Sequence, residues 1–206
     1  MTAAPFDSGD TVGDIRGRDD VPGQHDLGPV IERFDDAADR ALERVRGHRG
    51  LDRLFTAASH VGDFSLVWHT TNLMLGIRQR HPRQTITFAV LIGLESLVVN
   101  QGVKRIFRRT RPTVTGDDGL RVRQPSTSSF PSGHASAATF AAGLLAPRAG
   151  WPLSGVIRAA ASAVAVSRAY VRIHHASDVV AGLATGAVLL GATRRIMARM
   201  GLDRLI

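Results

Sequence analysis

The chain has 206 residues, a formal net charge of +8 and a sequence pI of about 11.4. This length suits one domain with its own hydrophobic core, and the absence of cysteine excludes disulfides and cysteine-based metal sites. The basic charge favours an anionic partner: a lipid headgroup, a phosphorylated substrate or nucleic acid. Because the basic residues gather at the ends of apolar segments, without an RNP-like aromatic pattern or zinc-finger spacing, we expect no nucleic-acid partner.

The amino-terminal part of the chain is polar and is predicted to be a tail followed by one helix. Residues 1–28 are rich in Gly, Asp and Arg and are expected to be disordered, because they hold too few apolar residues to bury. Over residues 29–47, apolar residues recur at helical spacing, with Gly28-Pro29 as a start signal and Gly47 as a stop signal. We expect an amphipathic helix that packs on the domain or lies on a membrane surface.

Residues 51–200 contain the mostly apolar segments 54–77, 85–103, 134–146, 153–166 and 177–197. We therefore expect an all-α fold, a bundle of about five transmembrane helices in a multi-pass protein of the cell membrane. Glu95 is costly in lipid and should face the bundle interior, bonded to another helix. In the last segment, three glycines suit close helix packing: Gly182, Gly186 and Gly191.

A cluster of charged residues lies at 167–178, with the sequence Ser-Arg-Ala-Tyr-Val-Arg-Ile-His-His-Ala-Ser-Asp. A neutral imidazole can attack phosphorus when a carboxylate holds its other ring nitrogen as N–H. His174 and Asp178 are four residues apart, so their side chains can meet if the segment is helical. Arg168 offers a planar set of donors for phosphoryl oxygens. The cluster indicates phosphoryl transfer through a histidine, and a charged loop between buried helices is the alternative.

Two upstream stretches supply further groups for a phosphate. Lys104 and Arg111 are seven residues apart, so both cations can point from one face of a helix that ends before Pro112. Over 131–134, with the sequence Pro-Ser-Gly-His, the proline is expected to open a helix whose positive end holds the next three residues. Backbone N–H groups at that end form an anion site, which a glycine lets the anion approach closely.

Together these stretches resemble the complete signature of the type 2 phosphatidic acid phosphatase superfamily. They are K-x6-R-P at 104–112, P-S-G-H at 131–134 and S-R-x5-H-x3-D at 167–178, in order and with no signature residue missing. The superfamily also includes soluble bacterial acid phosphatases and vanadium haloperoxidases. The resemblance spans residues 104–178 and continues over 179–182.

The resemblance implies a role for each signature residue. His174 is the nucleophile that forms a phosphohistidine, Asp178 orients it, and His134 is the general acid on the leaving oxygen and then the base for water. The groups that hold the phosphoryl oxygens are Lys104, Arg111, Ser132, Gly133 and Arg168. No metal or other cofactor is implied, because the cations take the place of magnesium.

Other polar residues near the signature receive no catalytic role. His175 is expected to be structural, because its spacing does not fit the family pattern. Several arginines are expected to be solvated or to contact lipid headgroups: Arg105, Arg108, Arg109, Arg121 and Arg123. The polar loop at 113–130 is expected to overlie the site as a lid.

A phospholipid or polyprenyl phosphate substrate follows from the membrane segments, since its apolar tail can lie between helices while its phosphate enters the basic pocket. The family implies phosphatidic acid, phosphatidylglycerol phosphate, polyprenyl pyrophosphates or polyprenyl-linked sugar phosphates, for example a decaprenyl-phosphoryl-ribose phosphate. Positive-inside counting favours a cytoplasmic site, whereas many lipid phosphatases of this family act on the outer face.

Three other functions stay open at this point. The first is a soluble acid phosphatase of the same fold, against which the lack of an apolar signal-peptide core in residues 1–24 argues. The second is a vanadate-dependent haloperoxidase. The third is a non-catalytic lipid-binding membrane protein, against which the intact His134, His174 and Asp178 argue.

Overall fold

The computed structural model describes residues 27–112 and 127–206, and within these ranges the chain is helical, without a strand. The helices are α1 (Pro29–Glu43), α2 (Arg49–Val61), α3 (Leu66–Gln79), α4 (Pro82–Leu97), α5 (Lys104–Ile106), α6 (Gly133–Ala149), α7 (Leu153–Tyr170) and α8 (Ala176–Arg199). A π-helix, η3 (Val98–Val103), joins α4 to α5, and the 3-10 turns η2 and η4 cover Asp63–Ser65 and Asp203–Leu205. Most of the predicted tail and of the predicted lid, residues 1–26 and 113–126, lies outside the described residues.

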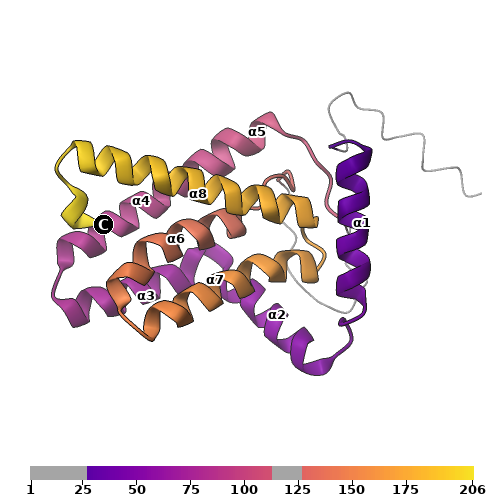
Figure 1. Cartoon of the computed structure of the whole chain (residues 1–206), viewed down its shortest axis with the longest axis horizontal. Coiled ribbons are helices and arrows are strands. Elements are labelled where there is room, and N and C mark those ends of the chain that lie inside the picture. The colour runs from indigo at the N-terminus through magenta and orange to yellow at the C-terminus, as the bar shows by residue number, and fades with distance from the viewer. Residues whose placement is uncertain (1–26, 113–126) are drawn as a thin grey trace, which may run out of the picture.

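Helix α6 is the centre of the bundle, and α3, α4, α7 and α8 all pack against it (Figure 1). Its sequence is rich in Ala, Leu and Gly on every face, so the helix is buried nearly all round. The core around it contains large side chains from several helices, among them Trp68, Phe88, Phe140 and Leu145. The predicted segment 134–146 lies inside this helix.

Helices α6 and α8 approach each other closely, because two glycines of α8 face the α6 backbone. A Cβ atom at Gly182 would overlap the carbonyl oxygen of Ser132, and one at Gly186 would overlap that of Ser136. For these two glycines the predicted close packing is confirmed. For Gly191 the same prediction is wrong, since a Cβ there would meet only open space.

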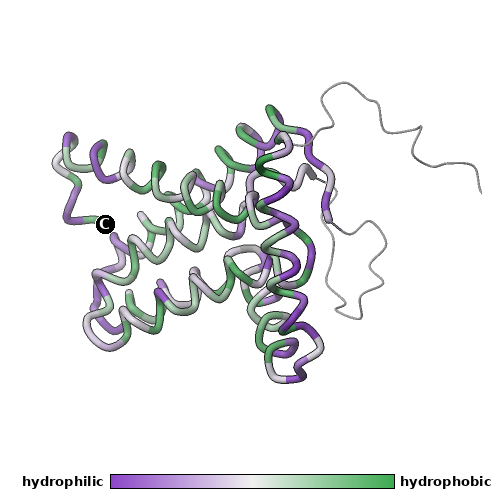
Figure 2. Tube along the Cα trace, turned by 45° about the vertical axis from the view of Figure 1, so that its right-hand side comes forward, coloured by the Kyte–Doolittle hydropathy of each residue, from purple (hydrophilic) through white to green (hydrophobic). Residues whose placement is uncertain are grey.

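Helix α4 continues through η3 and α5 as one stretch over Pro82–Ile106, and within the described ranges this stretch and α8 are the helices long and apolar enough to cross a membrane. On one face of α4, spaced three or four residues apart, four apolar side chains are more than half exposed: Ile86, Val90, Leu94 and Leu97. Glu95 is buried and accepts a hydrogen bond from the Ser136 hydroxyl, as its predicted inward orientation requires. Figure 2 shows hydrophobic residues along the bundle helices and hydrophilic residues at its ends.

The predicted single helix over 54–77 is wrong, because the chain breaks between α2 and α3. Gly62 ends α2, and Ser65 has a φ of 56°, in the left-handed region. A Cβ at Gly62 would lie 2.8 Å from Cγ1 of Val164 and 3.1 Å from Cδ2 of His134, so the backbone passes α6 and α7 closely here. The break brings the following residue, Asp63, to the start of α6.

Helix α1 crosses one end of the bundle at a steep angle to the other helices (Figure 1). It begins at Pro29, as predicted, ends at Glu43 and contacts α7 and α8. Of the two placements expected for this segment, the structure therefore has the helix packed on the domain. Two apolar side chains of this helix, Val30 and Phe34, are 67% and 50% exposed.

Candidate active site

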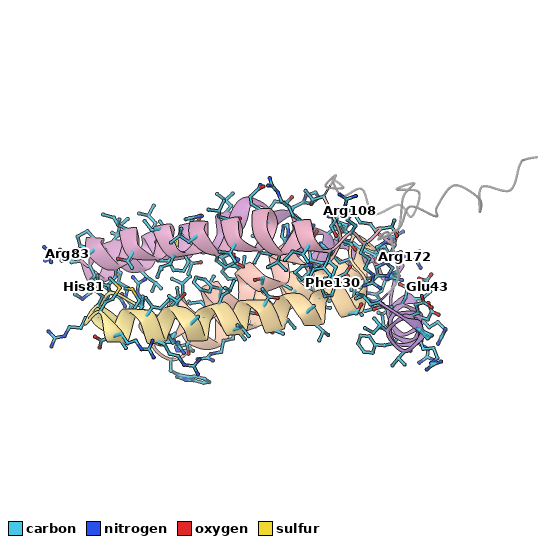
Figure 3. All side chains as sticks on the ribbon, turned by 90° about the horizontal axis from the view of Figure 1, so that it is seen from above. Glu43, His81, Arg83, Arg108, Phe130 and Arg172 are labelled. Carbon is cyan, nitrogen blue, oxygen red and sulfur yellow. The ribbon has the colours of Figure 1, made fainter. Side chains whose placement is uncertain are left out.

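A cavity of about 620 Å³ opens near the end of the bundle that α1 crosses. Figure 3 shows Glu43, Arg108, Phe130 and Arg172 at this end and His81 and Arg83 at the opposite end. Residues from all three signature stretches line the cavity, namely Lys104, Arg111, Gly133, His134 and His174. The rest of the lining comes from the turn between α2 and α3, from α3, α4, η3 and α6, and from the segment before α6: Gly62, Asp63, Ser65, His69, Ile92, Gly93, Glu95, Ser96, Asn100, Thr127 and Ala137. Three further signature residues, Ser132, Arg168 and Asp178, are buried and do not line the cavity.

His174 lies in the connection between α7 and α8 and is only 3% exposed. Its backbone N–H donates to the carbonyl of Arg168 at 3.0 Å, which fixes the connection to the end of α7. Burial lowers the pKa of His174 to about 3, against the opposing influence of Asp178. The imidazole is therefore neutral at ordinary pH, and its nitrogen lone pair is available.

Asp178 stands on the far side of the ring from the cavity, and its Oδ2 is 3.5 Å from Nδ1 of His174. The two side chains meet, as their spacing allowed, but not along one helix, because α8 begins only at Ala176. Instead Asp178 lies in the first turn of α8, and its Oδ2 accepts a hydrogen bond from the backbone N–H of His175 at 2.9 Å. The carboxylate thus caps the helix and faces the imidazole at once, and His175 has the structural position expected for it.

The cations of the first stretch reach the cavity from different kinds of backbone. Lys104 lies in α5 and is 9% exposed, but the helix ends at Ile106, so the prediction that Arg111 follows on the same helix is wrong. Arg111 instead reaches in from the non-helical segment after Phe107. Its Nη1 donates to the carbonyl of Ile173 at 2.9 Å and is 3.3 Å from Nε2 of His174. A guanidinium is therefore held beside the ring nitrogen that faces away from Asp178.

Arg168 lies in the last turn of α7 and is 1% exposed. Its Nη1 donates to the hydroxyl of Ser59 at 2.6 Å and lies 3.8 Å from Oδ1 of Asp63. This guanidinium is thus held in place by α2 and by the turn that follows it.

At the second stretch, Ser132 is the N-cap of α6, so the prediction that Pro131 opens the helix is wrong by two residues. The Ser132 hydroxyl accepts from the backbone N–H of Ala135 at 3.4 Å, and its own N–H donates to the carbonyl of Asp178 at 2.9 Å. A Cβ at Gly133 would be 3.1 Å from Oδ1 of Asn100, a residue of the π-helix η3. The absence of a side chain at Gly133 therefore keeps the helix end open toward the cavity.

His134, in the first turn of α6, is paired with a carboxylate that lies outside the signature stretches. Its Nε2 is 2.9 Å from Oδ1 of Asp63, in the break between α2 and α3. Asp63 is a charged residue within an apolar segment, and such a residue needs a partner when it is buried. That position in the sequence is the signal by which it could have been found.

Arg109 was expected to be solvated or to contact headgroups, and this prediction is wrong. The residue is 8% exposed, and its Nη1 donates to Oδ1 of Asp178 at 2.6 Å. Its Nη2 donates to Oδ2 of Asp35 on α1 at 2.7 Å. The serines of the predicted lid that are described support this segment: Ser128 accepts from the N–H of Arg109 at 3.1 Å, and Ser129 donates to the carbonyl of Thr110 at 2.9 Å.

The sequence over residues 84–201 matches the family model of the PAP2 superfamily. This match covers more than half of the chain, so the chain belongs to that superfamily, as its signature stretches predicted. It is a phosphatase, a hydrolase of phosphoric monoesters.

Its relatives are also phosphatases. The decaprenylphosphoryl-5-phosphoribose phosphatase of Mycobacterium tuberculosis strain H37Rv is 32% identical over 131 residues, which are 64% of this chain and 72% of that protein. The protein of the same name from Mycolicibacterium smegmatis is 33% identical over 129 residues, 61% of this chain and 68% of the relative.

Among solved structures, the transmembrane PAP2 type phosphatidylglycerolphosphate phosphatase from Bacillus subtilis aligns with a TM-score of 0.67. The alignment covers 84% of this chain and 89% of that one at 20% identity, so the likeness concerns the fold. Together with the apolar Pro82–Ile106 and α8, this transmembrane fold indicates a membrane protein.

Proposed function

We propose that this phosphatase removes the phosphate of a membrane lipid without a metal ion, through a phosphohistidine on His174. One observation carries the proposal: a buried neutral imidazole, the cations Lys104 and Arg111 and a second histidine, His134, all meet in one cavity. A nucleophile, charge-stabilising groups and a proton donor are the parts that a two-step phosphoryl transfer needs.

In the first step, Nε2 of His174 attacks phosphorus and the bond from phosphorus to the lipid oxygen breaks. The leaving oxygen takes a proton from His134, and Asp178, 3.5 Å from Nδ1, stabilises the positive charge that develops on the His174 ring. In the second step, His134 takes a proton from water, the oxygen of that water bonds to phosphorus, and the P–N bond breaks. Inorganic phosphate leaves and His174 is again neutral.

The negative charge of the transferring phosphoryl group spreads over its oxygens, and fixed donors can stabilise it. Arg111 stands 3.3 Å from the attacking nitrogen, which suits a contact with these oxygens. We assign the same task to Lys104, Arg168, the Ser132 side chain and the N–H of Gly133 at the start of α6. These groups would supply the charge that magnesium supplies in other phosphoryl-transfer enzymes.

We propose a multi-pass arrangement in the cell membrane. Helices α3, α6 and α7 would cross the bilayer together with the stretch Pro82–Ile106 and α8, and all three signature stretches would then lie at one face. Residues 51–200 would form the catalytic domain, residues 29–47 a helix at its face and residues 1–28 a tail. An apolar substrate tail could lie beside the exposed apolar face of α4 while its phosphate enters the cavity.

For the substrate we infer a polyprenyl-linked sugar phosphate. The relatives that are 32% and 33% identical over the aligned residues are decaprenylphosphoryl-5-phosphoribose phosphatases. The cavity lining also includes His69, Ser96 and Asn100, whose polar groups can bond sugar hydroxyls. Phosphatidylglycerol phosphate is the second candidate, on the likeness of fold to the Bacillus subtilis enzyme.

The test is phosphate release by the detergent-purified protein from a decaprenyl-phosphoryl-ribose phosphate, phosphatidylglycerol phosphate, phosphatidic acid and a prenyl pyrophosphate, with EDTA present. We expect turnover that survives EDTA, stops with vanadate and is absent in His174→Ala. Acid-labile label from phosphate-labelled substrate should appear on wild type and not on that variant. Label retained by His174→Ala would overturn the assignment of the nucleophile, and halide oxidation with added vanadate would point to a haloperoxidase.

A further inference from the structure

Asp35 is buried on a helix whose polar residues are otherwise mostly in solvent. It is 6% exposed, whereas its neighbours Asp36 and Asp39 are exposed. Its Oδ1 accepts from the backbone N–H of Ser177 at 2.7 Å, and its Oδ2 accepts from the Ser177 hydroxyl at 2.7 Å. Oδ2 also accepts from Nη2 of Arg109 at 2.7 Å. A carboxylate this deeply buried needs such partners, and all of its partners lie around the start of α8.

Arg109 joins this carboxylate to that of Asp178. Its Nη2 is bonded to Asp35, while its Nη1 donates to Asp178 Oδ1 at 2.6 Å and to the Ser177 hydroxyl at 2.7 Å. The other oxygen of Asp178 faces Nδ1 of His174 at 3.5 Å. A chain of contacts thus runs from α1 through one guanidinium to the carboxylate behind the nucleophile.

The charges along this chain decide what Asp35 contributes. A guanidinium 2.6 Å from Asp178 offsets the negative charge that the ring of His174 needs when it becomes cationic. Asp35 supplies a second carboxylate, so Arg109 is neutralised from its other side and a net negative charge is left for His174. Since the pair is almost free of solvent, water screens this effect little.

We propose that Asp35 is a positioning residue for phosphoryl transfer, acting through Arg109 on Asp178 and thereby on His174. The inference rests on the proposed histidine mechanism. Asp35 lies outside residues 84–201, which the family model matches, so helix α1 would add this device to the shared signature.

Helix α1 and the turn after it are held to the bundle by other contacts as well, so loss of the Asp35 charge need not release the helix. Arg46 donates from Nε to the carbonyl of Tyr170 at 2.9 Å and from Nη2 to that of Ala169 at 3.1 Å. Glu43 accepts from Arg172 at 2.6 Å. A variant at Asp35 can therefore report on chemistry while the fold is kept.

The test compares Asp35→Asn with Asp36→Asn, an exposed carboxylate on the same helix. We expect Asp35→Asn to lower kcat and the rate of phosphohistidine formation by roughly tenfold or more. KM should change by less than about twofold, because the substitution acts on the transition state rather than on substrate binding. Asp36→Asn should match wild type, and Asp35→Glu should recover part of the lost rate because it restores the charge.

Arg109→Gln gives a second, independent measurement. If the two side chains act as one unit, the double variant Asp35→Asn with Arg109→Gln should be no slower than the slower single variant, so the effects should not multiply. This comparison also serves if Asp35→Asn folds poorly, because the double variant, in which Asp178 is the remaining charge of the three, keeps the same net negative charge as wild type.

Equal rates of phosphohistidine formation for Asp35→Asn and Asp36→Asn would overturn the inference. A lowered Tm for Asp35→Asn with a normal rate well below that Tm would overturn it too and leave a structural role. If wild type forms no phosphohistidine, or if His174→Ala keeps full activity, the proposed function itself fails.

Discussion

His134 is the residue whose surroundings the motif describes least. The signature places it in the first turn of α6, but its Nε2 is paired with Asp63, 71 residues earlier in the chain. A carboxylate beside a histidine stabilises the imidazolium and holds the ring, as general acid catalysis requires. Asp63 is also 3.8 Å from Arg168, so it can align the proposed proton donor with a proposed phosphate-binding group.

Asp63→Asn keeps the size of that side chain and removes its charge. We expect single-turnover release of a lipid alkoxide to slow by roughly tenfold, a part of the ~10² to 10⁴ that a positioned acid supplies. An aryl phosphate, whose leaving oxygen needs little protonation, should react at nearly the wild-type rate. The burst of leaving-group release from both substrates measures this difference.

His134→Ala should show the same dependence on the leaving group, because both variants impair one proton transfer. The exposed Asp36→Asn is the control and should leave both bursts unchanged. Equal slowing of the lipid and the aryl substrate by Asp63→Asn would contradict the assignment and would point to weaker phosphate binding instead.

Burial of His174 also has a consequence for stability. Its pKa is lowered to about 3 in the fold, whereas an unfolded histidine titrates near ~6.5. Between these values the unfolded chain binds more protons, so the free energy of unfolding falls as the pH falls below about 6.5, by at most ~1.4 kcal/mol per pH unit.

His174→Gln removes this titration. On acidification from pH 7 to pH 5, we expect the Tm of wild type in detergent to fall by more than that of the variant, while above pH 7 the two curves run parallel. His81→Gln, at an exposed position, should follow wild type. Parallel curves for wild type and His174→Gln over the whole range would show that His174 is not buried in its neutral form.

At the scale of residues, the sequence predicted which signature residues meet, and their chemical roles stay predictions. It did not predict the partners Asp35, Asp63 and Arg109, because each contact joins positions far apart, as between Arg109 and Asp178, 69 residues away. A local pattern carries no record of such pairs. The sequence does show where a buried charge would be energetically unfavourable, since a charge inside an apolar segment must find a partner.

At the scale of elements, the packing of α8 on α6 fixes where Asp178 stands. The two helices touch through Gly186 and Gly182, and the carbonyl of Asp178 accepts the N–H of Ser132 at 2.9 Å. A change of spacing between the helices would therefore move the carboxylate relative to the start of α6.

Gly186→Ala tests this packing. Its Cβ would overlap the carbonyl oxygen of Ser136, so we expect α8 to be pushed away and the protein to lose about 1–3 kcal/mol of stability. Gly191→Ala, on the same helix but facing open space, should gain roughly 0.5–1 kcal/mol from its helix propensity. Thermal unfolding in detergent compares them, and an unchanged Tm for Gly186→Ala would contradict the close approach.

Most helices could be predicted from apolar periodicity, and the breaks could not. The predicted segments at 134–146, 153–166 and 177–197 each lie within one helix, because small apolar residues fill them. The expected helix over 54–77 breaks at Gly62, where tertiary contacts with Val164 and His134 set the path of the chain. Tertiary contacts also end the helix at Ile106, because Arg109 and Arg111 in the following segment donate hydrogen bonds to Asp178 and to the carbonyl of Ile173.

At the scale of the whole molecule, an apolar band lies between two charged ends (Figure 2). Exposed apolar side chains on several helices form this band, among them Leu73, Val90, Val156 and Val188. Arginines occur at both ends, with Arg83 at one and Arg108 and Arg172 at the other (Figure 3). In the proposed membrane arrangement this apolar band would set the depth of the molecule in the bilayer, with the cavity near one edge of it.

A pair of arginine substitutions on one helix face tests this arrangement. Leu94 is 52% exposed and lies 12 residues after Pro82, ~18 Å along a stretch of 25 residues and so near its middle. Ile86 is 65% exposed and close to the start of the same stretch, where a long side chain can reach the membrane surface. An arginine at a helix centre costs ~2.5–3.5 kcal/mol on insertion, and much less near an end.

We therefore expect Leu94→Arg to lower the amount of protein in the membrane fraction several-fold, while Ile86→Arg stays close to wild type. Quantitative immunoblots of membrane and soluble fractions, with expression matched, measure the difference. In a soluble protein of this fold both positions would face water, and both variants would be tolerated equally. Equal recovery of Leu94→Arg and Ile86→Arg from the soluble fraction would thus refute the membrane arrangement, because only hydrocarbon makes the central position costly.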